Sequence, residues 1–484
     1  MFSVNYFVCY FTFFFYWYVD GITDNYDLLY YLVICNERKS NGGNPPINKK
    51  TVYEVKMMIV VKGPQKVSGS VKVSGAKNSV LPIMCAALLT KEKVELENVP
   101  NLNDVKVLIN IIKQLGRDVS MNGDRLILHE MEELNYSNHV PSEASSIRYS
   151  LLLLGSLLST SKSITLPMPG GCNFSDRPID IHLYGLKQLG ANIIEGENHL
   201  VANTIGLKGT EITLRFPSVG ATENLLIASV LAEGETILRN VAREPEIDDL
   251  VKFLNELGAK ITYLGPNTMK IEGVPALEKK GVTYKIIPDR IEAATFAVLG
   301  ALASKDSLTI ENFVVEHNLV FLNILQRIGV NFEIISPNSL KVYHSPNLVA
   351  TSICTEVYPG LPTDIQPILA VLLTQAEGES IIEDSIYPTR FQYAKYLEKM
   401  GAHISLFEGG ICIQGKTSLE GAEVFSTDLR GGISVLLAGL IAKGETVIKN
   451  SYQIFRGYSE LSLKLEKIGA EVEEKVKEVG VLAY

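Results

Sequence analysis

A cysteine and an arginine lie five residues apart on a segment rich in glycine and proline. Within residues 166–182, two glycines precede Cys172 and a proline follows Arg177. Glycine opens backbone conformations to a loop, and proline suits the first turn of a helix. A thiol beside an arginine and a helix N-terminus ionises more readily. This pattern favours a reactive cysteine on a loop over an anionic substrate. A small cysteine buried in an ordinary loop remains the alternative.

Cations also recur where buried helices are predicted to begin, at Lys77, Arg148, Arg290 and Arg430. Helix N-termini present free N–H groups and the positive end of the helix dipole, so they bind anions. Capping by Ser, Thr or Asp explains Ser218, but it does not require a cation at these positions. We therefore interpret these helix starts as parts of an anion site.

A second set of cations follows the middle strand in four of the six repeated units. Besides Arg177 it contains Arg243, Arg390 and Arg456. If both sets lie at the same end of each domain, they converge. The expected result is a basic cleft in an acidic protein.

Acidic residues beside these cations are candidates for a general base. Asp364 is the first candidate and Asp428 the second. A carboxylate among Lys and Arg stays ionised, which suits proton abstraction from a bound hydroxyl. For Asp289 we expect a structural pairing with Arg290.

The elements that position these residues are repeated. An apolar residue followed by glycine closes a predicted helix six times, at 115, 189, 257, 328, 400 and 468. Such self-similarity indicates one supersecondary unit used six times. Each unit is predicted to contain a strand, a helix buried on all sides, a second strand, an amphipathic helix and two short strands.

The repeats predict an α/β protein of two domains with three units each. The first domain is expected to span 77–287, and the second to combine 58–76 with 288–484, so that the chain crosses twice. Residues 1–57 do not follow the pattern, and we interpret them as a dispensable extension, disordered or artefactual. Residues 1–18 are crowded with Phe and Tyr and long enough to cross a membrane, so a real anchor is the alternative.

Composition excludes several classes of function. The 484 residues carry a net charge of −9, which argues against a nucleic-acid binder. The six cysteines form no CxxC pair and the seven histidines no HxxH pair, so no metal site is expected. No phosphate-binding GxxxxGK[ST] and no GxGxxG after a strand occurs, so nucleotide cofactors lack support. Scattered free thiols suit a cytoplasmic protein, and His182 is expected to be a plain helix residue.

These residues resemble the enolpyruvyl transferases, and most closely the branch that uses UDP-N-acetylglucosamine. The matching segments are spread over residues 58–470: Ser74–Asn78, Pro169–Cys172, Arg177–Asp180, Ser218–Thr222, Ala242–Glu246, Pro288–Glu292, Pro362–Asp364, Thr427–Arg430 and Arg456–Tyr458. The resemblance implies a two-domain inside-out α/β barrel of six repeated units. It also implies transfer of the enolpyruvyl group of phosphoenolpyruvate to the sugar 3-hydroxyl with release of phosphate. This is the first committed step of peptidoglycan synthesis, and it needs no metal or organic cofactor.

The resemblance assigns roles to individual residues. Cys172 would be the general acid, able to form a covalent adduct and to be alkylated by the epoxide fosfomycin, and Asp364 the base. Phosphoenolpyruvate would be held by Lys77, Asn78, Arg177 and Arg456, with Lys77 and Arg456 also catalytic. The nucleotide sugar would be bound by Arg148, Arg177, Pro178, Ile179, Asp180, Ile181, Phe216, Pro217, Ser218, Val219, Asp364 and Ile386. Arg390 and Arg430 would help domain closure, and Asp428 would be a supporting residue of the site. Some relatives have Lys in place of Phe216.

Three other functions remain possible from the sequence. The shikimate-type transferase shares the fold and donor, but it lacks a cysteine in this loop. A non-catalytic relative would keep the cleft without the chemistry. A membrane-tethered scaffold depends only on residues 1–18.

Overall fold

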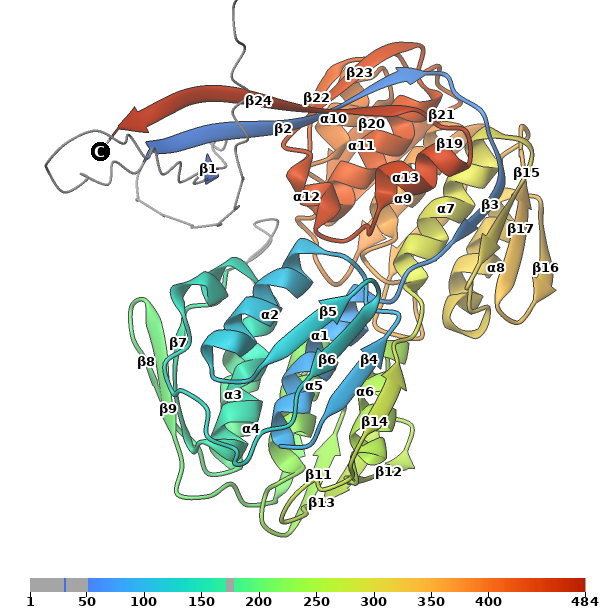
Figure 1. The fold of residues 1–484 in the computed structure, drawn as a ribbon. Coiled ribbons are helices and arrows are strands. Elements are labelled where there is room, and N and C mark those ends of the chain that lie inside the picture. The colour runs from blue at the N-terminus through green and yellow to red at the C-terminus, as the bar shows by residue number, and fades with distance from the viewer. Residues whose placement is uncertain (1–29, 32–50, 171–177, 484) are drawn as a thin grey trace, which may run out of the picture.

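Six small β-sheets surround two groups of buried helices, one group in each half of the molecule. The computed structural model describes residues 30–31, 51–170 and 178–483. Among these residues no helix is both long and apolar enough to cross a membrane. Figure 1 shows the two halves, with the first coloured blue to yellow-green and the second mainly yellow to red.

The first half contains eleven strands and six α-helices among the described residues. The strands are β4 (Val94–Glu97), β5 (Val119–Asn122), β6 (Arg125–Leu128), β7 (Ser163–Pro167), β8 (Asn192–Glu195), β9 (His199–Asn203), β10 (Glu211–Thr213), β11 (Glu235–Arg239), β12 (Lys260–Gly265), β13 (Thr268–Glu272) and β14 (Val282–Lys285). The helices are α1 (Lys77–Ala86), η1 (Ala87–Leu89), α2 (Asn103–Gln114), η2 (Ser142–Ser146), η3 (Arg148–Leu152), α3 (Leu153–Thr160), α4 (Asp180–Gln188), α5 (Val219–Ser229) and α6 (Pro245–Glu256), η marking 3₁₀ turns.

The second half begins with strands that precede the first half in the chain. Its strands are β1 (Tyr30–Tyr31), β2 (Thr51–Gly63), β3 (Val67–Lys72), β15 (Ser304–Glu311), β16 (Phe332–Ser336), β17 (Ser339–Tyr343), β18 (Ser352–Thr355), β19 (Gly378–Asp384), β20 (His403–Phe407), β21 (Gly410–Gly415), β22 (Glu423–Phe425), β23 (Gly444–Lys449) and β24 (Val472–Ala483). Its helices are α7 (Arg290–Ala303), η4 (Glu316–Asn318), α8 (Leu319–Ile328), α9 (Gln366–Thr374), α10 (Ala394–Lys399), α11 (Leu429–Ile441), α12 (Tyr452–Phe455) and α13 (Leu461–Lys467).

Five of the six sheets in the described part of the chain share one plan. A parallel pair, such as β10 with β11, is extended by two antiparallel pairings, here β11 with β13 and β13 with β12. The same plan occurs in the sheets that contain the parallel pairs β14–β4, β3–β15, β18–β19 and β22–β23. In the sheet β7-β9-β8, the parallel strand is reduced to a bridge between His139 and Thr165. The predicted six-unit α/β architecture is confirmed.

The glycine that closes each outer helix has one structural reason. In all six units this glycine has a positive φ, between 87° and 108°. Residues with a Cβ rarely adopt this left-handed conformation, whereas glycine does so without strain and lets the chain leave the helix. The six glycines are Gly116, Gly190, Gly258, Gly329, Gly401 and Gly469.

The helices inside each half are buried on all sides, as the sequence predicts. Every residue of α7 is buried, and Leu429–Leu440 of α11 are buried as well. By contrast, α2 and α6 bury one face and expose the other. A helix without a polar face is stable only where neighbours cover it entirely. The sheets therefore lie outside the helices, as in an inside-out barrel.

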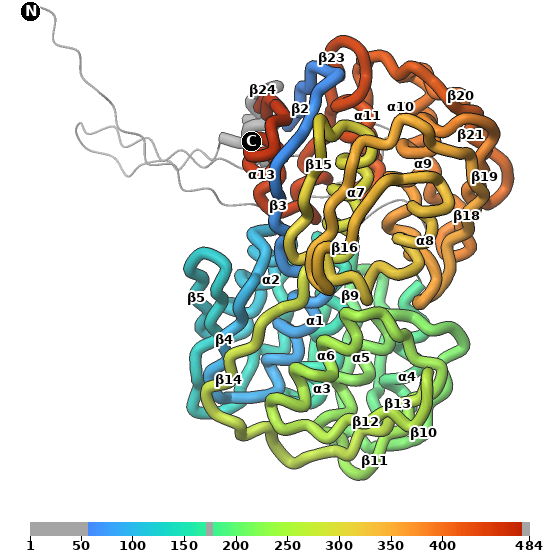
Figure 2. Tube along the Cα trace, turned by 90° about the vertical axis from the view of Figure 1, so that its right-hand side faces the viewer, coloured from blue at the N-terminus to red at the C-terminus, as the bar shows by residue number. Residues whose placement is uncertain are grey.

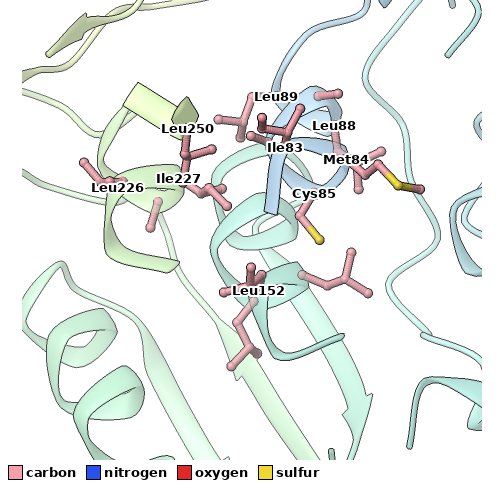
Figure 3. Close-up of a cluster of buried hydrophobic side chains, with 14 of the residues drawn as sticks. Ile83, Met84, Cys85, Leu88, Leu89, Leu152, Leu226, Ile227 and Leu250 are labelled. Carbon is pink, nitrogen blue, oxygen red and sulfur yellow. The ribbon is translucent and has the colours of Figure 1, made fainter. Parts of the chain in front are cut away.

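Two separate hydrophobic cores define the two domains. The first core is built from residues between Val80 and Ile286, and the second from Ile59–Val73 together with Ile291–Ala470. Figure 3 shows part of the first core, where Cys85 of α1 packs among leucine and isoleucine side chains. Burial raises the pKa of the Cys85 thiol. This cysteine therefore serves packing rather than reactivity.

The chain passes twice between the domains, and the two passages lie side by side (Figure 2). Gly75, on the way from β3 to α1, forms an antiparallel bridge with Pro288, on the way from β14 to α7. A Cβ on Gly75 would lie 1.8 Å from the backbone oxygen of Asn98, so a larger residue does not fit. The side chain of Asn98 in turn donates a 2.9 Å hydrogen bond to the carbonyl of Ile286. The Gly75–Pro288 bridge and the hydrogen bond from Asn98 thus fix the two crossing segments next to each other.

The boundary predicted at residue 57 is corrected by the structure, because it falls inside a strand. β2 begins at Thr51 and pairs with β24 from Thr51↔Ala483 to Val61↔Val472, so residues 51–57 belong to the last sheet. The two strands run out together from the second domain in Figure 1. Residues 1–29 and 32–50 of the predicted extension lie outside the described residues.

Candidate active site

Lys77 and Arg456 contact the same buried carboxylate, that of Asp104. Lys77 Nζ lies 2.7 Å from Asp104 Oδ2. Arg456 donates through Nε to Oδ1 at 3.1 Å and through Nη2 to Oδ2 at 3.3 Å. The three residues are at most 6 % exposed. Two cations thus share the carboxylate of Asp104.

The three residues come from three separate segments. Lys77 begins α1, Asp104 is the second residue of α2, and Arg456 lies between α12 and α13. Arg456 belongs to the second domain and Asp104 to the first. The ion pair therefore joins the domains at the level where the chain crosses between them.

Opposing effects set the ionisation of Asp104. Burial by itself raises the pKa of this carboxyl, but Lys77 and Arg456 together outweigh burial and hold the pKa below its ordinary value. A buried carboxylate that loses such partners becomes strongly unfavourable, and the same is true of the cations. The group is therefore ionised and closely coupled.

A second cluster of the same kind surrounds Asp364, two residues before α9. Arg390 Nη1 donates a 2.6 Å hydrogen bond to Oδ1, and Arg430 Nη2 donates a 3.1 Å hydrogen bond to Oδ2. Both arginines are at most 3 % exposed. Burial raises the pKa of Asp364, but Arg430 and Arg390 more than reverse this and hold it well below the usual range.

Two other carboxylates that the sequence singles out are helix caps. Asp428 Oδ1 accepts hydrogen bonds from the backbone N–H groups of Arg430 and Gly431 at the start of α11, 2.8 and 3.3 Å long. An N-cap role accounts for this carboxylate structurally, and the prediction of Asp428 as a second base is not tested. Asp428 Oδ1 also lies 3.7 Å from Arg390 Nη2, so this residue contacts the cluster around Asp364.

Asp289 differs from the prediction. It caps α7 by accepting from the N–H groups of Ile291 and Glu292. Arg290 does not pair with it but with Glu246, with Nε 3.0 Å from Oε1. This buried pair again joins the two domains.

A pocket of about 590 Å³ is lined by residues of both domains, and one of them is Thr389, which precedes Arg390 in the chain. Seven of the predicted nucleotide-sugar residues line it: Arg148, Pro178, Ile181, Phe216, Ser218, Val219 and Ile386. Ser218 caps α5, so free N–H groups of that helix are next to the pocket. Ile386 comes from the second domain and the others from the first.

The other predicted site residues named here do not line the pocket or lie outside the described residues. Ile179, Pro217 and Asp180 adjoin lining residues in the chain without lining the pocket, and Asp180 forms a 2.5 Å ion pair with Arg215. Asn78 follows Lys77 in the first turn of α1. Cys172 and Arg177 lie outside the described residues, so their predicted roles are not tested.

Arg243 does not join the predicted basic cleft. Its guanidinium lies 4.1 Å from the ring centroid of Tyr263 and 3.4 Å from Asp248, and it also donates to the carbonyl of Pro266. These contacts explain Arg243 as a structural residue of the first domain.

Sequence reasoning missed three buried polar residues of this region. Asp104 appears in the sequence as an ordinary acidic residue in the first turn of an amphipathic helix. His182, predicted to be a plain helix residue, is buried and lines the pocket, with Nδ1 3.1 Å from Asn224 Nδ2. Glu223 also lines the pocket, is fully buried, and neither carboxyl oxygen has a hydrogen-bond partner. An acidic residue inside a predicted apolar helix was the available signal for Glu223.

Comparison with known proteins identifies the family. The sequence model of the EPSP synthase (3-phosphoshikimate 1-carboxyvinyltransferase) family matches residues 61–465. The chain belongs to this family of enolpyruvyl transferases. It is a transferase of the inside-out barrel type, and the match spans both domains.

Curated relatives of this transferase carry a more specific name. UDP-N-acetylglucosamine 1-carboxyvinyltransferase 1 of Carboxydothermus hydrogenoformans is 43 % identical over 413 residues, which cover 85 % of this chain and 96 % of the relative. The UDP-N-acetylglucosamine 1-carboxyvinyltransferase of Finegoldia magna is 41 % identical over 420 residues, covering 86 % and 98 %.

Solved structures of lower identity share the fold of this transferase. The enolpyruvyl transferase NikO from Streptomyces tendae matches with a TM-score of 0.80 at 24 % identity, covering 87 % of this chain and 99 % of NikO. EPSP synthase from Acinetobacter baumannii matches with a TM-score of 0.68 at 20 % identity, covering 87 % and 100 %. At these identities the likeness supports the fold alone.

Proposed function

We propose that this transferase moves the enolpyruvyl group of phosphoenolpyruvate to the 3-hydroxyl of UDP-N-acetylglucosamine and releases phosphate. The observation that carries the proposal is the similarity of 41–43 % over nearly the whole length of relatives named for this reaction. It is the first committed step of peptidoglycan synthesis.

Phosphoenolpyruvate carries two anionic groups, and the site offers two clusters of buried cations. Lys77 and Arg456 form one cluster, and Arg390 and Arg430 form the other. Arginine binds carboxylate and phosphate through two parallel hydrogen bonds, which fixes orientation as well as charge. This arrangement supports binding of the donor between the domains. Arg177 is proposed to join it from the loop that carries Cys172.

The pocket between the domains suits the nucleotide sugar. Its volume of about 590 Å³ lies within the range of small-molecule sites. Ser218 and Val219 stand at the start of α5, where free N–H groups favour a diphosphate. Arg148 adds a cation, and Pro178 and Ile181 add apolar surface for the nucleobase of the nucleotide sugar.

The chemistry needs one acid and one base. In the addition step the 3-hydroxyl oxygen bonds to C2 of the donor, its proton passes to Asp364, and Cys172 protonates C3. In the elimination step C3 returns a proton to the Cys172 thiolate, the C2–O bond to phosphate breaks, and the proton held by Asp364 leaves with the phosphate. The arginines around Asp364 lower its basicity, so they must turn toward the negative charge of the substrates before this carboxylate accepts a proton.

The second candidate acceptor is shikimate 3-phosphate, because the matching family model is named for that reaction. We favour the nucleotide sugar because the EPSP synthase structure is only 20 % identical. The loop cysteine of this sequence also argues against the shikimate type.

Phosphate release tests the proposal. Wild-type protein and Cys172→Ala are incubated with phosphoenolpyruvate and either acceptor. Release only with UDP-N-acetylglucosamine, lost or greatly slowed in the variant, is the expected result. Release with shikimate 3-phosphate alone, or with neither acceptor, contradicts the proposal.

A cytoplasmic location is part of the proposal. Both substrates are small soluble anions, and the cysteines are scattered along the sequence without a CxxC pair. No nucleic-acid or membrane partner is included. Fractionation of native cells tests this location, and recovery in the membrane fraction contradicts it.

A further inference from the structure

The donor atoms of the Lys77–Arg456 pair are occupied by the protein itself. Asp104 takes Lys77 Nζ together with Nε and Nη2 of Arg456. Nε and Nη2 form the forked side of a guanidinium, which binds phosphate or carboxylate in bidentate geometry. Nη1 is used by the side-chain oxygen of Gln453 at 3.2 Å. A substrate anion therefore cannot use the fork of Arg456 while Asp104 holds it.

The charge of the group also favours exchange. One carboxylate faces two cations, and all three side chains are at most 8 % exposed. A phosphate dianion brings two negative charges to these cations, whereas the Asp104 carboxylate brings one. In a buried site this difference matters because the effective dielectric is lower than that of water.

We propose that Asp104 is a surrogate anion, which occupies Lys77 and Arg456 in the free protein and is displaced when a phosphate group binds. The inference rests on the proposed function, because it assigns these cations to the phosphate of the donor. After the transfer, Asp104 competes with the product phosphate for the same nitrogen atoms of Lys77 and Arg456. It therefore positions the cations, limits phosphate affinity and assists product release.

Binding of inorganic phosphate to the full chain tests the inference without any acceptor. Wild type and Asp104→Asn are compared by titration calorimetry and by thermal unfolding with and without phosphate. The amide keeps the shape of the side chain but removes the charge. We expect the variant to bind phosphate about tenfold more tightly, equivalent to about 1.4 kcal/mol, and its melting temperature to rise more with phosphate than that of wild type.

The repeated architecture provides a matched control in Glu246→Gln. Glu246 is the second residue of α6, as Asp104 is of α2, and it also joins the domains by a buried ion pair, with Arg290. It is 3 % exposed, as Asp104 is. Its cation lies outside the Lys77–Arg456 pair, so this variant should show the same phosphate affinity as wild type.

Unchanged or weaker phosphate binding by Asp104→Asn overturns the inference, and so does an equal tightening in the Glu246→Gln control. If Asp104→Asn fails to fold cooperatively even in saturating phosphate, the inference is also overturned, because phosphate should replace the lost charge. The proposed function is tested separately by acceptor-dependent phosphate release. Tighter binding by Asp104→Asn without transfer to UDP-N-acetylglucosamine would support the exchange and reject the acceptor.

Discussion

Arg390 donates a 2.6 Å hydrogen bond to Asp364, the carboxylate that we propose as the base. Arg430 occupies the other carboxylate oxygen. In this arrangement Asp364 is ionised but a poor proton acceptor. Its basicity must therefore depend on what the two arginines bind, which couples proton abstraction to occupation of the site by substrate anions.

Replacing Asp364 by Asn should lower kcat by at least about 100-fold, since a general base contributes at least this much. Steady-state phosphate release with the nucleotide sugar measures the effect. The chemistry should be lost while the nucleotide sugar still binds, so a dissociation constant within about tenfold of wild type is expected by calorimetry. A kcat near that of wild type would show that another group accepts the proton.

The same substitution predicts a change in acid stability. The folded pKa of Asp364 lies below the unfolded value of about 3.9. Its contribution to stability is therefore complete at neutral pH and is lost only as the pH falls below about 4. Asp364→Asn should be less stable than wild type at pH 7, by about 2 kcal/mol because a quarter of the side chain is exposed, and this gap should narrow below pH 4. Urea unfolding at several pH values measures it. A gap that widens in acid would contradict the sign.

Asp428 should behave as a cap rather than a base. Asp428→Ala should lose about 1 kcal/mol of stability, and Asp428→Asn should lose less, because Asn is also a good N-cap. Turnover should fall by less than about tenfold in the Asn variant, far less than for a lost general base. Denaturant unfolding and phosphate release provide the two readouts. A large loss of kcat in Asp428→Asn with normal stability would support Asp428 as a candidate base.

The domain junction should not tolerate a methyl group at Gly75. Gly75→Ala places a Cβ against the backbone oxygen of Asn98, and we expect a loss of about 3 kcal/mol. Gly265→Ala is the matched control, because a Cβ there meets no atom within 4 Å, so its effect should stay below about 0.5 kcal/mol. Thermal unfolding compares the two variants. Equal stabilities would mean that the junction can shift without cost.

Glu223 should destabilise the protein at neutral pH. Burial, and then the charges of Glu246 and Glu244, raise the pKa of this carboxyl well above its ordinary value. The stability of the neutral form is complete below the ordinary glutamate pKa of about 4.3 and is lost as the pH rises toward the folded value. Glu223→Gln should therefore be more stable than wild type at pH 8 and similar at pH 4. A larger advantage at pH 4 than at pH 8 would contradict this account.

An epoxide such as fosfomycin should modify Cys172 and leave Cys85, Cys354 and Cys412 unmodified. The pKa values of Cys85, Cys354 and Cys412 are all raised, in each case first by desolvation, so little thiolate forms at pH 7. Peptide mass spectrometry after treatment locates the adduct. Cys172→Ala is the control and should remain unmodified. An adduct on Cys85, Cys354 or Cys412 in wild type would contradict the prediction.

The repeated α/β plan was predictable because local rules dictate it. Gly258 closes its helix by adopting a positive φ, and the apolar helix after Asp289 has no polar face, so each signal can be read within a few neighbouring residues. The cations at helix starts were found for the same reason. A cation such as Arg430 that opposes the helix dipole needs another explanation, here its contact with Asp364.

The partners of these cations could not be read from the chain. Asp104 and Arg456 are separated by more than three hundred residues, and the acidic first turn of an amphipathic helix is common in any protein. The predicted pairing of Asp289 with Arg290 was wrong, because the side chains of adjacent residues point in different directions where a helix begins. Asp289 caps α7, and Arg290 pairs with Glu246. The strand at Thr51 was missed because its partner, β24, is at the opposite end of the sequence.

The pairing of β2 with β23 and β24 has a consequence for synthesis of the chain. Residues 58–63 leave the ribosome early, but their ladder partners in β23 are residues 444–449. The first core needs nothing beyond Ile286 and can form while the chain is still growing. At typical translation rates β2 waits on the order of half a minute for its partners. The second domain is thus the last to be completed, although its strands β2 and β3 are synthesised before the first domain. Until their partners are made, these strands are the segments most in need of protection from mispairing.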